Sequence, residues 1–113
     1  MATAFRNVLH TEIGISEVEV ITVATAARAT IIGMSLTNLT GGIILASIRV
    51  ENTVASTPND SAYYIKEVVI PANQSLRVIN GGEKLVLAGD MKVYVQTNVE
   101  DSLDFIASYV EIT

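Results

Sequence analysis

The sequence predicts an all-β fold, a single antiparallel β-sandwich of about eight strands with jelly-roll or immunoglobulin-like topology and an N-terminal strand or arm. Half of the 113 residues are apolar but only 5% are aromatic, so Val, Ile, Leu and Ala must build most of the core, as suits a packed sheet. Apolar runs rich in Val, Ile and Thr recur between clusters of Gly, Asn, Pro and Ser, while helical periodicity is weak throughout. A chain of this length supports one domain, residues 1–113.

The apolar runs place the strands in order along the chain. The first run begins within residues 1–13, which we expect to form either an edge strand or an extended arm. Each later run is bounded by residues that favour turns. The expected strands are Phe5–Ile13, Val18–Ala24, Ala29–Asn38, Gly42–Glu51, Ala62–Ile70, Ser75–Ile79, Lys84–Leu87, Met91–Thr97 and Leu103–Ile112.

The alternation of side chains indicates which faces are covered. In Met91–Thr97, apolar Val93 and Val95 alternate with polar residues, which predicts one core face and one wet face. In Leu103–Ile112 and in residues 41–50, both faces are apolar. A single-domain sandwich covers only one face of each sheet, so such strands predict a second covering surface, and a neighbouring subunit is the economical candidate.

The glycine-rich stretch INGGEKLVLAGD, Ile79–Asp90, has two interpretations: a phosphate-binding loop or two turns around a short strand. A phosphate loop needs the spacing GxxxxGK followed by Ser or Thr at the start of a helix, whereas Lys84 is followed by Leu85 and strand-like residues. We therefore predict turns at residues 80–82 and 88–90. Further turns are expected at residues 38–42, 71–74 and 99–102, and a long polar loop that could carry contacts at 51–61.

The composition argues against most kinds of chemistry. A formal net charge of −5, with seven basic residues scattered singly, leaves no basic stripe for nucleic acid. The absence of cysteine removes disulfides, thiolate zinc sites and cysteine nucleophiles. His10 is the only histidine and no GxSxG pattern occurs, so we expect a half-exposed strand histidine rather than a catalytic one. The sequence therefore predicts a protein that is not an enzyme and has no cofactor.

Acidic and apolar segments offer weak alternatives. Asp60, or Glu100 with Asp101 and Asp104, could hold calcium, but the ordered spacing of a calcium loop is missing and a solvated acidic turn is the preferred interpretation. The N-terminal residues lack the pattern of a signal peptide, and the most apolar window, residues 41–50, has about half the length of a membrane span. We expect neither a secretory signal nor a membrane partner.

Two places are predicted to contact partner proteins. In the N-terminal strand the apolar alternation predicts an intersubunit contact through Phe5, Val8 and Leu9. In the pair Tyr63–Tyr64, one ring points to each face of a strand, so one ring is expected in the core and the other at the surface or an interface.

Three segments together show a family resemblance: ARATIIGMSLTN, YYIKEVVIPANQSLRVINGGEKLVLAGDMKVYVQ and LDFIASYVEIT. Their order of extended segment, proline turn, glycine turn and final strands resembles small β-sandwich virion structural proteins of tailed bacteriophages, of decoration, cement, neck or tail accessory type. The resemblance covers residues 24–113 and includes no catalytic motif.

The resemblance implies a non-enzymatic virion protein, first of all a capsid decoration or cement protein that binds and stabilises the shell. It implies a homo-oligomer, with a trimer as one arrangement, in contact with other virion proteins such as the major capsid protein, located in the virion and assembled in the host cytoplasm. A neck, collar, tail or fibre-attachment protein is the second virion role. A carbohydrate-binding sandwich that uses Tyr63 or Tyr64 is the alternative from another class.

Overall fold

The computed structural model describes residues 2–52, 60–79 and 84–113, and it confirms an all-β sandwich. None of the described segments forms a helix that could cross a bilayer. Every predicted strand is present, with ends shifted by at most two residues. The strands are β1 (Thr3–Ile13), β2 (Val18–Thr22), β3 (Arg28–Asn38), β4 (Ile44–Asn52), β5 (Asp60–Ile70), β6 (Ser75–Ile79), β7 (Leu85–Leu87), β8 (Met91–Thr97) and β9 (Leu103–Ile112).

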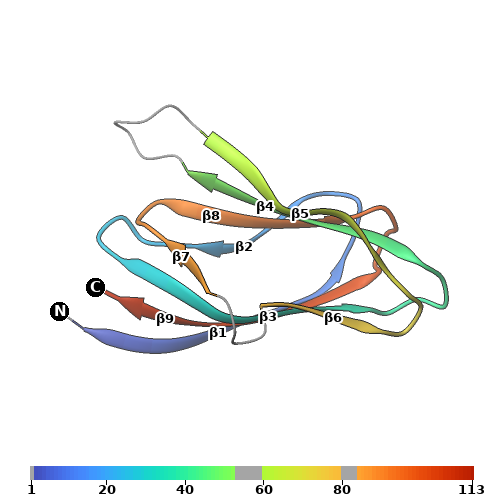
Figure 1. The fold of residues 1–113 in the computed structure, drawn as a ribbon, viewed down its shortest axis with the longest axis horizontal. Helices are drawn as coiled ribbons and strands as arrows, with labels where there is room; N and C mark the ends of the chain where they lie inside the picture. The colour runs from blue at the N-terminus through green and yellow to red at the C-terminus, as the bar shows by residue number, and fades with distance from the viewer. Residues whose placement is uncertain (1, 53–59, 80–83) are drawn as a thin grey trace.

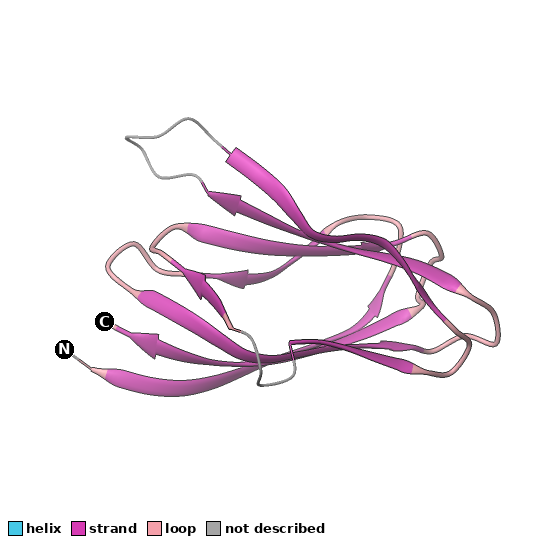
Figure 2. Ribbon diagram, in the orientation of Figure 1, coloured by secondary structure: helices cyan, strands magenta, loops and turns pink. Residues whose placement is uncertain are grey.

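The strands form two antiparallel sheets packed face to face (Figure 1, Figure 2). The first sheet has the order β1-β9-β3-β6, with β7 also paired to β3, and the second has the order β2-β8-β4-β5. The pairs are nested: β1 with β9, β2 with β8, β3 with β6 and β7, and β4 with β5. The chain is thus one long hairpin wrapped across two sheets, which is the jelly-roll alternative of the two predicted topologies.

The sandwich has nine strands instead of eight because the edge strand beside β3 is divided into two short strands, β6 and β7. β6 pairs with residues 34–37 of β3, and β7 pairs with residues 29–31 of the same strand. The two short strands therefore occupy one strand position, so the sandwich has eight positions, as the sequence predicts. The predicted turn at residues 80–82 lies outside the described residues, as do residues 53–59 of the predicted long loop.

The core lies between the inner faces of the two sheets and is aliphatic, as the composition requires. Phe105 of β9 is the one fully buried aromatic side chain among the described residues. It lies among aliphatic residues from both sheets, such as Ile31, Leu36 and Ile48. Val93 and Val95 are fully buried, which confirms the predicted core face of β8. Removal of this apolar surface from water is the main stabilising term of the fold.

Two of the strand bounds that differ from the predicted ones are set by hydrogen bonds made in turns, so that β2 ends earlier and β4 begins later. β2 ends at Thr22 rather than Ala24, since the Val23 carbonyl accepts a hydrogen bond from the N–H of Asp90 in the turn before β8 (2.9 Å). β4 begins at Ile44 rather than Gly42, because the Gly42 carbonyl is held in the preceding turn by the side chain of Asn38 (2.8 Å).

Asn38, the last residue of β3, ties together the turns at one end of the sandwich. Its side chain is buried, and its amide nitrogen donates to the carbonyls of Gly42 (2.8 Å), Ile70 (3.0 Å) and Pro71 (3.1 Å). Its amide oxygen accepts hydrogen bonds from the N–H and the hydroxyl of Thr40, both at 2.8 Å. Removal of this side chain would take away the buried hydrogen bond to the Ile70 carbonyl, whereas the Gly42 and Pro71 carbonyls keep donors in Thr40 and Gln74. Loss of a partner from a buried polar group costs more than the net value of the bond itself.

Asn38→Ala should therefore lower the free energy of unfolding by about 2–4 kcal/mol. Asn98→Ala is the matched control, because Asn98 is exposed and its side chain accepts one hydrogen bond, from the N–H of Leu45 (2.9 Å). Urea unfolding of both variants measures the difference. Equal losses for the two asparagines would contradict the structural role of Asn38.

Gly89→Ala should cost about 1–3 kcal/mol through overpacking in the turn before β8. A β-carbon on Gly89 would lie 2.2 Å from the carbonyl oxygen of Thr25, a backbone atom that cannot rotate away. Gly41→Ala is the control, since a β-carbon there meets nothing within 4 Å. A thermal melt in which both alanine variants behave alike would show that the Gly89–Thr25 approach is not a constraint.

Candidate interaction surfaces

The outer face of the first sheet is built from apolar and small polar side chains. Val8 and His10 of β1 lie opposite the buried residues Ala107 and Phe105 of β9, so the odd-numbered residues of β1 point outward. We call this surface the apolar face. Its apolar members are Phe5, Leu9, Ile32, Val86, Ile106, Val110 and Ile112.

The register of the strands arranges these residues in rows across the sheet. One row runs from Phe5 through Val110 and Thr30 to Val86. A second row places Leu9 beside Ile106. The two rows bring neighbouring apolar side chains into direct cross-strand contact, and they leave the largest of them, Phe5, 80% exposed.

On β1, β9 and β3 the centre of the apolar face carries no charge, and Arg77 of β6 ends the row of Leu9, Ile106 and Ser35. Between the two apolar rows lies a polar row of Asn7, Ser108 and Gly33. All residues of β1, β9 and β3 are described. Within the three rows, none of their outward-pointing side chains is charged. The exposed apolar side chains present on the order of 600 Å², the upper end for the largest patch of a typical monomer. The largest apolar patch of a monomer is often functional, so the apolar face is a candidate binding surface.

The hollows on the apolar face are open and small. One of about 310 Å³ is lined by Ile32, Ile106 and Arg77, among others. A second, of about 210 Å³, lies beside His10, which is half-buried as the sequence predicts. In this hollow the Asp104 carboxylate accepts a hydrogen bond from the Thr11 hydroxyl. This geometry suits docking of another surface better than conversion of a substrate.

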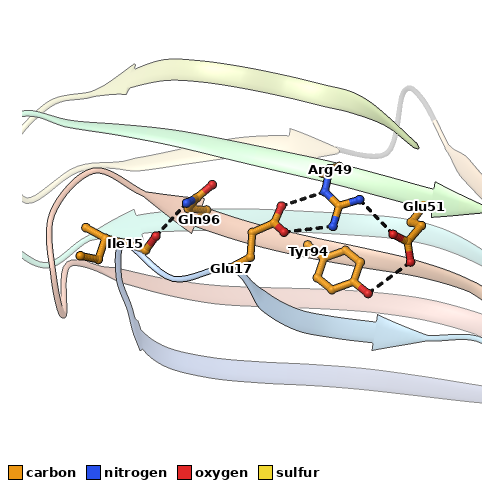
Figure 3. A network of polar contacts seen from close by, with 6 residues as sticks. All are labelled: Ile15, Glu17, Arg49, Glu51, Tyr94 and Gln96. Atoms are coloured by element: carbon orange, nitrogen blue, oxygen red, sulfur yellow. Dashed lines mark hydrogen bonds and ion pairs between the residues drawn. The ribbon is translucent and has the colours of Figure 1, made fainter. Parts of the chain in front are cut away.

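The outer face of the second sheet is charged, and we call it the charged face. Arg49 of β4 donates two hydrogen bonds to the Glu17 carboxylate (2.8 and 3.0 Å) and one to Glu51 (3.1 Å), as Figure 3 shows. Its guanidinium carbon lies 4.4 Å from the centre of the Tyr94 ring. The Tyr94 hydroxyl donates to the other oxygen of Glu51 (3.3 Å). These groups satisfy one another and leave no open reactive centre among them.

Contacts within the network shift the pKa values of Glu17, Arg49 and Tyr94. Hydrogen bonds from Arg49 lower the pKa of Glu17 below its ordinary value of 4.5, and the same contacts raise the pKa of Arg49. Desolvation, with the nearby charge of Glu51, raises the pKa of Tyr94. All three shifts stabilise the protonation state that each group has at neutral pH, namely charged Glu17, charged Arg49 and neutral Tyr94, so the network is a stabilising element and not an acid–base pair.

The structure separates the five predicted contact residues into two groups. Phe5 and Leu9 lie exposed on the apolar face, while Val8 points inward and packs against the core. Tyr63 is 47% exposed on the charged face with the Lys66 ammonium 5.0 Å from its ring, and Tyr64 packs against the core. One tyrosine ring on each face of β5 is the predicted arrangement. The contacts of all five residues with partners remain a prediction.

Several members of the apolar face were not predicted as contact residues. Ile106, Val110 and Ile112 carry a sequence signal, because they are the apolar positions on the second face of Leu103–Ile112. Ile32 and Val86 carry none. Their place on the face follows from a bulge in β3 near Gly33 and from the pairing of β7 with β3.

The acidic corner is held within the fold. Glu100 accepts a hydrogen bond from the N–H of Ile15 (2.9 Å), and the adjacent Asp101 adopts a left-handed backbone conformation, φ 50°. No group of three or more potential metal ligands occurs among residues 2–52, 60–79 and 84–113. These carboxylates therefore act in the described structure as turn residues.

Comparison with known proteins gives a likeness of fold. No protein-family model and no curated protein matches the sequence. A chain in the structure of the T13 IBDV viral particle aligns with 96% of this chain at a TM-score of 0.59 and 6% identity, and this chain spans 30% of its length. A Bacillus endospore appendage protein, from disulfide-linked pili, aligns with 99% of this chain at a TM-score of 0.52 and 8% identity, with 87% of its own length covered. Identities this low establish the fold alone.

Glu17→Gln should lower the free energy of unfolding by about 1 kcal/mol at pH 7. Since the pKa of Glu17 is lowered by folding, its contribution is complete above 4.5 and is lost as the pH falls through the lowered pKa. The difference from wild type should therefore shrink as the pH falls below 4.5. Urea unfolding at several pH values measures it, with Glu12→Gln, an exposed glutamate outside the network, as the control. A difference that persists unchanged at pH 3 would contradict the ion-pair explanation.

Proposed function

We propose that the protein is a non-enzymatic structural protein of a tailed-bacteriophage virion, a capsid decoration protein that binds and stabilises the shell. The observation that carries the proposal is the apolar face, whose central rows contain no charge on β1, β9 and β3. The charged groups of the charged face, by contrast, are engaged with one another. The apolar face is thus suited to contact with another protein, and the charged face to contact with water.

Two comparisons support the same class of function. The fold is similar to that of a protein from a viral particle and to that of a protein from pili. The order of strands and turns in residues 24–113 resembles small virion proteins of tailed bacteriophages. In this proposal the partners are further copies of the chain and the major capsid protein, and the location is the virion.

A repeated shell explains how a modest surface could be sufficient. Buried area does not convert directly into affinity, because association costs translational and rotational freedom. On a symmetric lattice, however, each copy meets neighbours at fixed distances, so contacts made by an oligomer reinforce one another. An apolar face of ordinary size can then stabilise a particle without an unusually strong single contact.

The proposal is tested by charge placed on each face in turn. Ile106→Lys puts an ammonium in the middle of the apolar face and should weaken binding to shells stripped of this protein by about tenfold or more, since burial leaves the charge unpaired. Val69→Lys is the matched control, because Val69 is a 54% exposed apolar residue opposite Leu45 on the other sheet. Co-sedimentation measures binding, and circular dichroism confirms folding.

The contrary result is loss of binding in Val69→Lys with Ile106→Lys unaffected, which would assign the shell contact to the charged face. Imaging of the particle separates the virion roles. Hundreds of copies over the shell support decoration, while about a dozen at the head–tail axis would favour the neck, collar, tail or fibre-attachment role.

A sugar-binding role is favoured by one observation. The Tyr63 ring is exposed and lies beside Arg49 and Lys66, a combination of aromatic face and polar groups that can hold a sugar. Glycan-array binding that disappears in Tyr63→Ala would support this second candidate.

A further inference from the structure

One edge of the sandwich is less protected than the other three. An unpaired strand edge invites pairing with another chain, and proteins protect such edges by short strands, bulges and charges. β6 and β7 are short, and β2 has five residues with a bulge. β5 contains two register shifts and, at Lys66 and Glu67, two adjacent charges.

β1 has fewer of these devices over most of its length, because its one charged residue before the bulge, Arg6, is paired with Glu111 of the neighbouring β9 (2.7 Å). It is 11 residues long, and its register with β9 runs without a break from Thr3 to His10. The single bulge follows His10, where Glu12 has φ 56°. No other described strand pairs with the edge of β1 that faces away from β9.

The alternation of hydrogen-bonded and non-hydrogen-bonded pairs between β1 and β9 shows which residues of β1 direct their backbone N–H and C=O groups to the open edge. Ala2 and Thr113 exchange both backbone hydrogen bonds (3.0 and 2.9 Å), so the even-numbered residues of β1 bond to β9. The N–H and C=O groups of Phe5, Asn7 and Leu9 therefore point away from β9. The side chains of the same residues lie on the apolar face.

From this geometry we infer that β1 pairs antiparallel with β1 of a second copy of the chain around a two-fold axis at Asn7. The register places Phe5 of each copy beside Leu9 of the other, which forms two cross-strand apolar pairs, and Asn7 beside Asn7. This inference goes beyond the proposed function and stands without it.

Neighbouring registers are less favourable. A two-fold axis at Arg6 would place two arginines directly opposite each other, which is destabilising for like charges. An axis at Val8 would place Phe5 beside Thr11 and Asn7 beside Leu9, so neither apolar residue would meet an apolar partner. Of these three axes, the one at Asn7 matches apolar with apolar and polar with polar.

The pairing would also extend the apolar face. The two first sheets would become one continuous sheet across the two-fold axis. The Phe5–Val110 row of one copy would then continue into the Leu9–Ile106 row of the other. A second copy thus fits the edge by its backbone and by its side chains.

Asn7→Pro tests the pairing with little effect on the intrachain sheet. Proline removes the N–H that points to the open edge, and edge strands accept proline at such positions. By symmetry the dimer loses two hydrogen bonds, so its dissociation constant should rise by about tenfold or more. Asn7→Ala, which retains the N–H, is the control and should remain dimeric. Sedimentation equilibrium of the full chain, of mass 12.1 kDa, measures both.

A single cysteine tests the register directly, because the chain has no cysteine of its own. Asn7→Cys places two thiols in a directly paired position, with Cα atoms about 5.5 Å apart, and should form a disulfide-linked dimer on mild oxidation. Thr3→Cys is the control, since its two copies would lie about 27 Å apart along the paired strands.

Several outcomes would overturn the inference. One is a wild-type chain that stays monomeric at high micromolar concentration, and another is an Asn7→Pro variant that dimerises as wild type does. A third is cross-linking of Thr3→Cys as efficient as that of Asn7→Cys. If Asn7→Pro fails to fold, the two cysteine variants still decide the question. A dimer that forms but does not bind shells would leave this inference standing and count against the proposed function.

Discussion

In a two-layer sandwich each sheet has one covered face, so a strand that is apolar on both sides leaves one side in water. β9 is such a strand. Its side chains Phe105 and Ala107 belong to the core, whereas Ile106 on the opposite side is 48% exposed. Because β9 lies between β1 and β3, this uncovered side is the middle of the first sheet. The outer face of the second sheet is also uncovered, but it carries charged side chains, Arg49 and its carboxylate partners, in place of apolar ones.

The open edge and the apolar face are one feature of the molecule, because the strand period of two links them. Phe5, Asn7 and Leu9 direct their backbone groups to the edge and their side chains to the face. A contact at the edge therefore also arranges the residues that a shell would meet. Pairing with a second copy would enlarge the apolar surface without any new apolar residue, and this connects the inferred dimer with a role in a repeated assembly.

The strands could be predicted from the sequence because alternation and turn residues are local signals, and the nested pairing could not. The early end of β2 depends on Asp90, which is far away along the chain, and the late start of β4 depends on the side chain of Asn38, four residues before Gly42. The prediction of Phe5 and Leu9 as contact residues placed them on a strand but could not say which side of it faced the core. Ile32 and Val86 join the face only through the register of β3 with its neighbours, which depends on long-range pairing.

The central claim is that the molecule makes its contacts through the first sheet and its β1 edge. Amide hydrogen exchange of the protein bound to the shell proposed as its partner, compared with the dilute free chain, tests it most directly. The account predicts that the amides of Phe5, Asn7 and Leu9, which the free chain leaves directed to the open edge, become protected. Amides at the β5 edge should exchange as before. Protection that appears along β5 while these three amides stay unprotected would contradict it.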